Sequence, residues 1–462
     1  MTLADFYKAY YGNKRIREII KSQLEDALFC VGSGPALLAK NWAFPVKLVP
    51  KKKLDILLDE GLDIFRPVAS TSESFYIFWD LEYYNRDDRG YIYRNQNQVF
   101  KKMQVIKDEI NKIFDKYKIK YILDVTASGF HYWMKISKKS SVFKNFSESG
   151  FLSESIKEKY LDPDPEDLKK KEKISLQEAM AYDCAGKILE FVTHILRGRL
   201  RDFPLQITIS DAAAPGMFEG FSSDITQYGH PMFMRVFRVI ASLHQKNIMF
   251  HGGNLPAINA VWGRDDTLED ILERMWNYRK SLAFFENFNF ELDFSDEGFS
   301  KLYEDYMKSS VSRIHREFEN APPEKIKIQE EPEEVRIFFE KERANPCLLD
   351  PFYLRKIISF YAKQGAQRVK GIMSLIARYY EDEAFNWYDP VKMRGIDWKK
   401  YDAKQAANFW GRVYFTQFIL DNIVEPSGVL YPKMLDLKNP SGSELKVKNE
   451  KWKNVDPSGS GI

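Results

Sequence analysis

The chain has 462 residues, of which 44% are hydrophobic and 29% are charged, a composition typical of soluble globular proteins. Its length exceeds what one hydrophobic core usually supports, so two domains are expected. The formal net charge of +3 excludes nucleic-acid binding driven by overall charge. Any affinity for nucleic acid must therefore come from local basic patches.

Membrane and cysteine-based classes are also excluded at this stage. No apolar run reaches the roughly 18 residues of a membrane span, and the N-terminus lacks a signal-peptide pattern, so we expect no membrane contact and a cytoplasmic location. Cys30, Cys184 and Cys347 are too widely spaced for a zinc cluster or a disulfide framework. Accordingly, neither a structural zinc nor an iron–sulfur cluster is expected.

The first part of the chain alternates between helical and strand patterns. Residues 1–30 carry apolar side chains at helical spacing, which predicts one amphipathic helix. An apolar strand ends at Asp80-Leu81-Glu82, and a helix is expected over about 97–117. A strand over about 119–125, a turn and a second strand over about 130–136 complete a β-α-β-β unit.

The middle of the chain contains a predicted insertion. Residues 137–178 are rich in serine, proline and runs of like charge, which predicts an exposed loop. A helix over about 175–196 leads to a strand at 205–209, and further helices are expected up to about 319.

The clearest linker pattern is rich in proline and glutamate and covers residues 321–335. It divides the chain into a predicted catalytic domain over 1–320 and a predicted helical domain over 336–440, in which apolar side chains recur at helical spacing. The remaining residues, 441–462, are expected to be a disordered tail.

The first stretch with chemical content is the acidic end of the early strand. Asp80 and Glu82 are two residues apart, so their side chains point to the same face. The preceding residues, Phe75 to Trp79, are too apolar for an edge strand. Two carboxylates leaving such a strand repel each other unless a cation neutralises them, so we predict a divalent metal site here.

The second stretch places a serine and a histidine around a glycine turn. Ser128 and Gly129 precede a strand in which His131, Trp133 and Lys135 share one face, while the residues between them form an apolar face. Because hydroxyl, imidazole and ammonium groups together suit a triphosphate, we predict that Ser128, His131 and Lys135 bind phosphate.

The third stretch contributes one more carboxylate and a run of cations. Asp224 is the preferred third metal ligand, with Asp211 as the alternative. Arg235 and Arg238 have opposite parity in a strand, so both face one site only if a bulge or turn intervenes. The further candidates for nucleotide binding in this stretch are Ser242, His244 and Lys246.

Taken together, these three stretches resemble the signatures of archaeo-eukaryotic primases and primase-polymerases. The segment from Arg238 to Lys246 is similar to the Arg-x-Pro-Gly-Ser-Leu-His-x-Lys stretch of the archaeal primase catalytic subunit, and the resemblance covers roughly residues 1–320. It implies an α+β fold in which helices flank an RRM-like mixed sheet, followed here by an α-helical C-terminal domain.

The chain also departs from that family. Ile240 and Ala241 replace the proline and glycine of the third signature, the first pair is Asp80/Glu82 rather than two aspartates, and the cysteines of the zinc-binding knob are absent. These departures favour a primase-polymerase of a mobile element, or one with an accessory role in replication or repair, over a housekeeping primase subunit.

The resemblance implies a specific chemistry. Asp80, Glu82 and Asp224 would hold two Mg²⁺ or Mn²⁺ ions during attack of a 3′-hydroxyl on the α-phosphate of an NTP or dNTP. The implied partners are a single-stranded DNA template, a primer, and a helicase or other replication proteins. The implied nucleotide-binding residues are Ser128, His131, Lys135, Arg235, Arg238, Ser242, His244 and Lys246.

Three alternatives stay open from the sequence. An end-joining repair polymerase would share the core, although the C-terminal helical extension argues against it. A metal-dependent nuclease also uses clustered carboxylates, but the expected Glu-x-Lys after the acidic strand is not apparent. In a nicking replication initiator a second histidine would stand where Trp133 stands.

Overall fold

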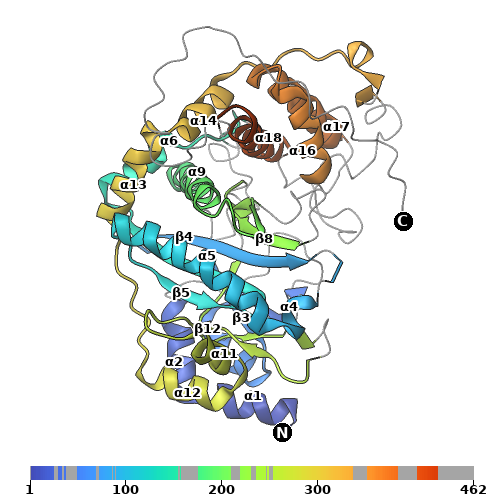
Figure 1. Ribbon diagram of the computed structural model, residues 1–462. Coiled ribbons are helices and arrows are strands. Elements are labelled where there is room, and N and C mark those ends of the chain that lie inside the picture. Colours follow the sequence, from blue (N-terminus) through green and yellow to red (C-terminus); the bar gives the residue numbers. More distant parts are fainter. Residues whose placement is uncertain are drawn as a thin grey trace.

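The protein has a mixed α and β architecture, in which helices flank a mixed sheet (Figure 1). This agrees with the α+β class expected from the sequence. The computed structural model describes residues 2–24, 30–33, 36–37, 49–68, 72–85, 87–88, 90–154, 157, 175–209, 219–229, 236–245, 247–248, 253–333, 335–336, 351–382 and 403–424.

The main sheet has six strands in the order β12-β5-β6-β4-β8-β7. All neighbours are antiparallel except β7 and β8, which run parallel. The twelve-residue strand β4 lies inside the sheet and pairs on both sides, which is why its residues are so apolar. The strands are β4 (Ser74–Asn85), β5 (Ile122–Val125), β6 (Gly129–Ser137), β7 (Gln206–Thr208), β8 (Glu219–Asp224) and β12 (Ala260–Val261).

One face of this sheet is covered by helices. Trp79 of β4 and Tyr132 of β6 point to this face and pack against Phe114 of α5, with ring centroids 6.0 and 5.2 Å apart respectively. On the same face, Thr193 of α9 lies 2.7 Å from Ser223 of β8 between hydroxyl oxygens. The covering helices are α5 (Gln96–Tyr117), α6 (Ser141–Ser149) and α9 (Leu176–Arg199), with the short α4 (Tyr91–Arg94) before them.

The opposite face carries Asp80 and Glu82, and a second sheet packs against part of it. This sheet has the order β2-β1-β3-β9. Phe237 of β9 stacks on Phe78 of β4, with ring centroids 4.5 Å apart, and so joins the two sheets. The strands are β1 (Cys30–Ser33), β2 (Ala36–Leu37), β3 (Asp63–Pro67) and β9 (Val236–Arg238), and a separate pair is formed by β10 (Leu243–His244) and β11 (Ala257–Ile258).

The N-terminal region differs from the single helix predicted over 1–30. The chain turns at Gly12 and Asn13, and the Asn13 side chain accepts hydrogen bonds from the first turn of the next helix, which is the action of an N-cap. Two helices result. The helices of this end of the molecule are α1 (Leu3–Tyr11), α2 (Lys14–Gln23), α3 (Leu54–Asp59) with the 3₁₀ turn η1 (Lys51–Lys53), α11 (Leu268–Trp276) and α12 (Tyr278–Asn287).

Further helices lie at the opposite end from α1 and α2 (Figure 1). Among them α18 packs on α14 and η3, and its buried Arg412 lies 2.9 Å from the Asp183 carboxylate of α9. The elements are α13 (Asp296–Lys308), α14 (Ser310–Asn320), α16 (Pro351–Ala362), α17 (Ala366–Asp382), α18 (Ala403–Ile419), the π-helical turn η8 (Leu420–Val424) and the 3₁₀ turns η3 (Thr226–Gly229) and η5 (Ile328–Glu330).

The segment 321–335 that the sequence marks as a linker packs against its surroundings. Ile326 and Glu331 are buried, and the Glu331 carboxylate binds Arg368 of α17. The helical residues beyond it therefore share one continuous hydrophobic core with residues 1–320.

Within the predicted insertion 137–178, residues 141–149 form α6, and 158–174 lie outside the described residues, as does the predicted tail 441–462.

No helix in the described part of the chain combines the length and hydropathy that crossing a bilayer requires.

Candidate functional site

The two carboxylates of β4 occupy the sheet face that the helices leave uncovered. Asp80 and Glu82 alternate with Leu81, which points to the helical face. The Asp80 side chain retains 17% of its exposure although it lies in a central strand. The strand therefore delivers two acidic groups to one accessible surface, as the sequence predicts.

The third predicted carboxylate lies next to them. Asp224, the last residue of β8, is directly opposite Asp80 in the antiparallel ladder. Directly opposed residues share a face, and their Cβ atoms are about 4.5–5.5 Å apart. The structure thus brings Asp80, Glu82 and Asp224 onto one face, while the alternative ligand, Asp211, lies outside the described residues.

The carboxylate oxygens of Asp80, Glu82 and Asp224 suit a hard divalent cation, although the three side chains are not gathered around one point. Asp80 Oδ1 is buried, and the described contact that compensates its charge is the ion pair with Nε2 of His131 at 3.3 Å. Oxygen-rich sets of this kind bind Mg²⁺ or Mn²⁺, and one ion can bridge carboxylates on neighbouring strands. Nevertheless, the described ranges contain no cluster of three or more His, Cys, Asp or Glu side chains that could hold a metal ion.

His131 lies beside Asp80 on the other side of β4. It is directly opposite Asp80 in the β4–β6 ladder, and its Nε2 is 3.3 Å from Asp80 Oδ1. Its Nδ1 is 3.2 Å from Oδ2 of Asp124 on β5. Burial alone would lower the pKa of His131, but the Asp124 and Asp80 carboxylates outweigh burial and raise the pKa well above its usual value of 6.5.

Asp124 is a functional candidate that the sequence reasoning missed. Its side chain is fully buried, and its Oδ1 accepts a hydrogen bond from Nε1 of Trp133. A charged residue inside the apolar run Tyr121 to Val125 was the available signal, because a buried carboxylate requires partners. Trp133, predicted to share the face of His131, therefore serves as a hydrogen-bond donor to Asp124.

The glycine turn connects the second sequence stretch to the first. The Ser128 hydroxyl donates to Glu82 Oε1 at 3.3 Å. Gly129 pairs with Glu82, and a Cβ at position 129 would lie 2.2 Å from the Leu81 carbonyl oxygen, so only glycine allows this approach. The turn thereby fixes Ser128 beside the carboxylate pair.

The same turn also contacts the third stretch. The backbone N–H of Ala127 donates to Nδ1 of His244 at 3.2 Å, so Nδ1 of His244 is an acceptor. All three sequence stretches are therefore linked by direct contacts, from Asp80 and Glu82 through the turn at Ser128 to His244.

Arg238 and Ser242 take parts that differ from simple phosphate ligands. Arg238 is buried, and its guanidinium binds the Asp63 carboxylate and lies 4.5 Å from the Phe65 ring centroid. The Ser242 hydroxyl is fully buried and accepts a hydrogen bond from the Ile64 N–H at 2.7 Å. Ser242 therefore anchors the backbone of β3 in this structure.

Arg238, Ser242 and His244 do not lie on one continuous strand. The chain leaves β9 at Arg238, turns at Ile240–Ala241 and enters β10 at Leu243, so strand parity does not relate these side chains. Ala241 has φ of 65°, a left-handed conformation that glycine adopts most readily. It stands where the resembling signature has its glycine, the residue type that adopts this conformation most readily.

Side chains of α1 and α2 form hydrogen bonds with the backbone of this turn, residues 240–243. The Tyr10 hydroxyl donates to the Ala241 carbonyl at 2.9 Å, and the Tyr11 hydroxyl accepts from the Leu243 N–H at 2.8 Å. Gln23 accepts from the Ile240 N–H at 2.7 Å. The N-terminal helices thus hold the third stretch in place through polar side chains.

Among the predicted residues that the structure describes, Lys135 lies apart from the group. Lys135 lies four residues further along β6 than His131, and its ammonium is 4.4 Å from the Phe294 ring centroid, away from the carboxylates. Arg235 and Lys246 lie outside the described residues.

The chain was also compared with known proteins. No protein-family model matches it, and neither a curated protein nor a solved structure shows significant similarity to it.

Proposed function

We propose that this protein is a DNA-dependent primase-polymerase of the archaeo-eukaryotic primase type. It transfers a nucleotide from an NTP or dNTP onto a primer or an initiating nucleotide on single-stranded DNA, with a role in a mobile element or in accessory replication or repair. One observation carries the proposal: three sequence stretches that are far apart in the chain meet at Asp80, Glu82, Asp224, Ser128, His131 and His244.

In this reaction the carboxylates of Asp80, Glu82 and Asp224 would hold Mg²⁺ or Mn²⁺. When bound, such ions lower the pKa of the attacking hydroxyl and stabilise negative charge in the transition state. The protein residues align the reactants at the open sheet face, and cationic His131 offers an N–H to a phosphate oxygen or to Asp80. His244 accepts a hydrogen bond from the turn at Ala127 that borders this face, while Arg238 binds Asp63 of β3.

The deciding experiment supplies single-stranded DNA, labelled nucleotides and Mg²⁺ or Mn²⁺, with and without a primer. Products without primer identify a primase, and products only with primer identify a polymerase of the end-joining kind. Asp80→Asn and Glu82→Gln should abolish incorporation, whereas Asp265→Asn, an exposed acidic residue outside the site, should not. Shortened template without incorporation would identify a nuclease and refute the proposal.

A further inference from the structure

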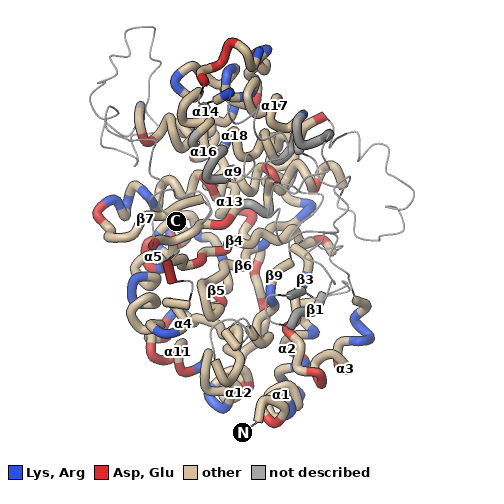
Figure 2. The backbone as a smooth tube through the Cα atoms, turned by 90° about the vertical axis from the view of Figure 1, so that its right-hand side faces the viewer, with Lys and Arg blue, Asp and Glu red and all other residues tan. Residues whose placement is uncertain are grey.

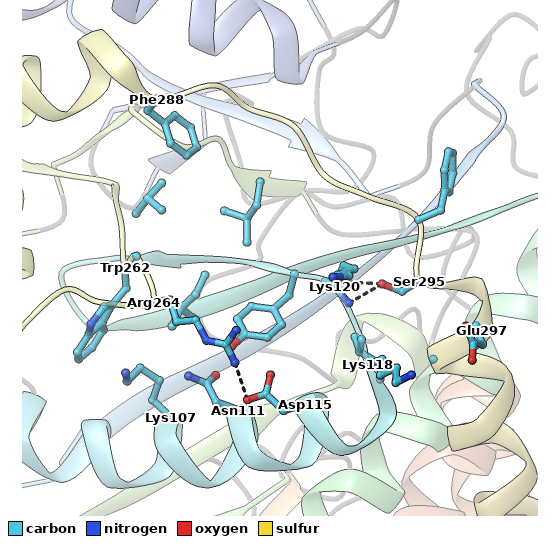
Figure 3. Close-up of a pocket in the computed structure, with 18 residues that line it drawn as sticks. Lys107, Asn111, Asp115, Lys118, Lys120, Trp262, Arg264, Phe288, Ser295 and Glu297 are labelled. Atoms are coloured by element: carbon cyan, nitrogen blue, oxygen red, sulfur yellow. Dashed lines mark hydrogen bonds and ion pairs between the residues drawn. The ribbon is translucent and has the colours of Figure 1, made fainter.

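A groove lies at the β5–β12 edge of the main sheet, beside the candidate site. It has a volume of about 590 Å³. Side chains of α5 form one side, the end of β12 and the following residues form a second, and the segment 288–298 closes it (Figure 3). Its position differs from the open face that carries Asp80 and Glu82.

The groove is connected to the candidate site through the sheet. Four ladder pairings align one row of side chains across five strands: Asp224, Asp80, His131, Asp124 and Val261. Val261, the last of the row, lines the groove. Because neighbouring strands are about 4.8 Å apart, the groove begins roughly 14 Å from Asp80.

The charges of the groove are predominantly positive. Its lining contains four cationic side chains and two carboxylates, namely Lys107, Lys118, Lys120, Arg264, Asp115 and Glu297. Lys118 and Lys120 are exposed, whereas the exposed guanidinium of Arg264 lies 2.9 Å from the Asp115 carboxylate and is paired with it. Figure 2 shows basic and acidic residues interspersed along the described chain, so this local excess of cations is not a consequence of the overall charge.

Aromatic side chains accompany these cations. Tyr121, Trp262, Phe288 and Phe294 line the groove. Phe294 is 47% exposed, unusual for a large apolar side chain, and Lys135 approaches its ring. Lys107 lies 4.5 Å from the Trp262 ring centroid in the same way. Cations beside accessible rings offer both a phosphate contact and a stacking surface.

We propose that this groove binds a single strand of nucleic acid, with phosphates on Lys118 and Lys120 and a base stacked on Phe294. Unpaired bases can stack on aromatic rings, whereas the bases of a duplex are already stacked, so the combination favours a single strand over a duplex. The inference rests on the proposed function, for which this strand is the template on its way to the carboxylates.

The test measures binding of a fluorescently labelled single-stranded oligonucleotide to the full chain by anisotropy, over a range of salt concentrations. The double variant Lys118→Glu/Lys120→Glu should bind about tenfold more weakly or worse. Losing two phosphate contacts should also lower the slope of log K against log salt by about 1.4. Phe294→Ala should weaken binding about fivefold or more without changing the slope.

The matched control is Lys112→Glu/Lys144→Glu, which makes the same change in charge at exposed lysines that do not line the groove. The proposal is overturned if the wild type does not bind the oligonucleotide, if the groove variant binds like the wild type, or if the control loses as much affinity. Thermal unfolding of each variant verifies that it is folded.

Oligonucleotide binding and nucleotide incorporation are measured separately, so this inference and the proposed function can fail independently. Asp80→Asn/Glu82→Gln should keep wild-type binding of the oligonucleotide while losing nucleotide incorporation, which supports both. If the wild type binds through the groove but never incorporates nucleotides, the groove assignment stands and the primase-polymerase assignment fails.

Discussion

The imidazole of His131 lies between two carboxylates: its Nδ1 is 3.2 Å from Oδ2 of Asp124, and its Nε2 is 3.3 Å from Oδ1 of Asp80. Asp124 lies on β5 and contributes nothing to the exposed surface. A fixed partner at Nδ1 determines the ring orientation, and its negative charge stabilises the protonated imidazole. Asp124 is therefore a positioning residue for His131.

Replacing Asp124 by asparagine should reduce nucleotide incorporation by about 10- to 100-fold, because partners behind a functional histidine contribute on that scale. Asparagine keeps the size of the side chain but can turn an amide NH₂ toward Nδ1. Trp133→Phe removes the hydrogen bond from the indole N–H to Asp124 together with part of a fully buried ring, so it should lower stability but reduce incorporation much less. Steady-state kinetics measure incorporation by both variants, and ¹⁵N NMR of the histidine reports its protonation state. Wild-type kinetics and an unchanged protonation state in Asp124→Asn would contradict the positioning role.

The left-handed turn at Ala241 predicts an unusual order of substitutions. Ala241→Gly should be neutral or stabilising by up to about 1 kcal/mol, since glycine adopts φ of 65° without the strain of a Cβ. Ala241→Val should destabilise the protein by more than about 2 kcal/mol, because a β-branched residue is strained at positive φ and the site is fully buried. Denaturant unfolding measures both. Equal stability of the two variants would show that the turn does not require this backbone conformation.

Arg412 joins the C-terminal helix α18 to the rest of the protein by buried charge. Its guanidinium lies 2.9 Å from Asp183 and 3.7 Å from both Glu190 and Glu319. Removing one partner of a buried ion pair costs about 3–5 kcal/mol, so Arg412→Gln should destabilise the protein by about that amount. Arg279→Gln at an exposed position should change stability by less than about 0.5 kcal/mol.

The same network predicts the fate of a truncated chain. A fragment ending near residue 325 retains Asp183, Glu190 and Glu319 but lacks Arg412, and it exposes the face of α14 on which α18 packs. It should therefore unfold at lower denaturant concentration than the full chain, or aggregate. Circular dichroism and denaturant unfolding test this. A fragment as stable as the full chain would show that residues 1–320 fold independently, as the sequence predicts.

The buried network also predicts a dependence of stability on pH. Burial would raise the pKa of Glu190, but His315, His194 and Arg412 outweigh burial and hold the pKa well below its usual value of 4.5. The unfolded chain thus binds a proton at Glu190 before the folded chain does, and the stability that the carboxylate contributes is lost as pH falls below about 4.5. The difference in unfolding free energy between wild type and Glu190→Gln should shrink from pH 6 to pH 3. A constant difference would mean that Glu190 has the same pKa in both states.

Local sequence determined the elements that carry the candidate site. Alternation in a strand is a property of neighbouring residues, so the shared face of Asp80 and Glu82 follows from their spacing alone. The helix predicted over about 97–117 matches α5, because its apolar spacing is also local.

Only the tertiary structure decided which of these elements meet. The pairing of Asp80 with Asp224 and His131, the contact of His131 with Asp124, and the ion pair of Arg238 with Asp63 all depend on strand order and register. Strand order and register arise from the packing of the whole core, which no short stretch of sequence encodes. For the same reason the sequence did not predict the ion pair between Arg412 and Asp183. The proline- and glutamate-rich segment 321–335 instead indicated a boundary between domains.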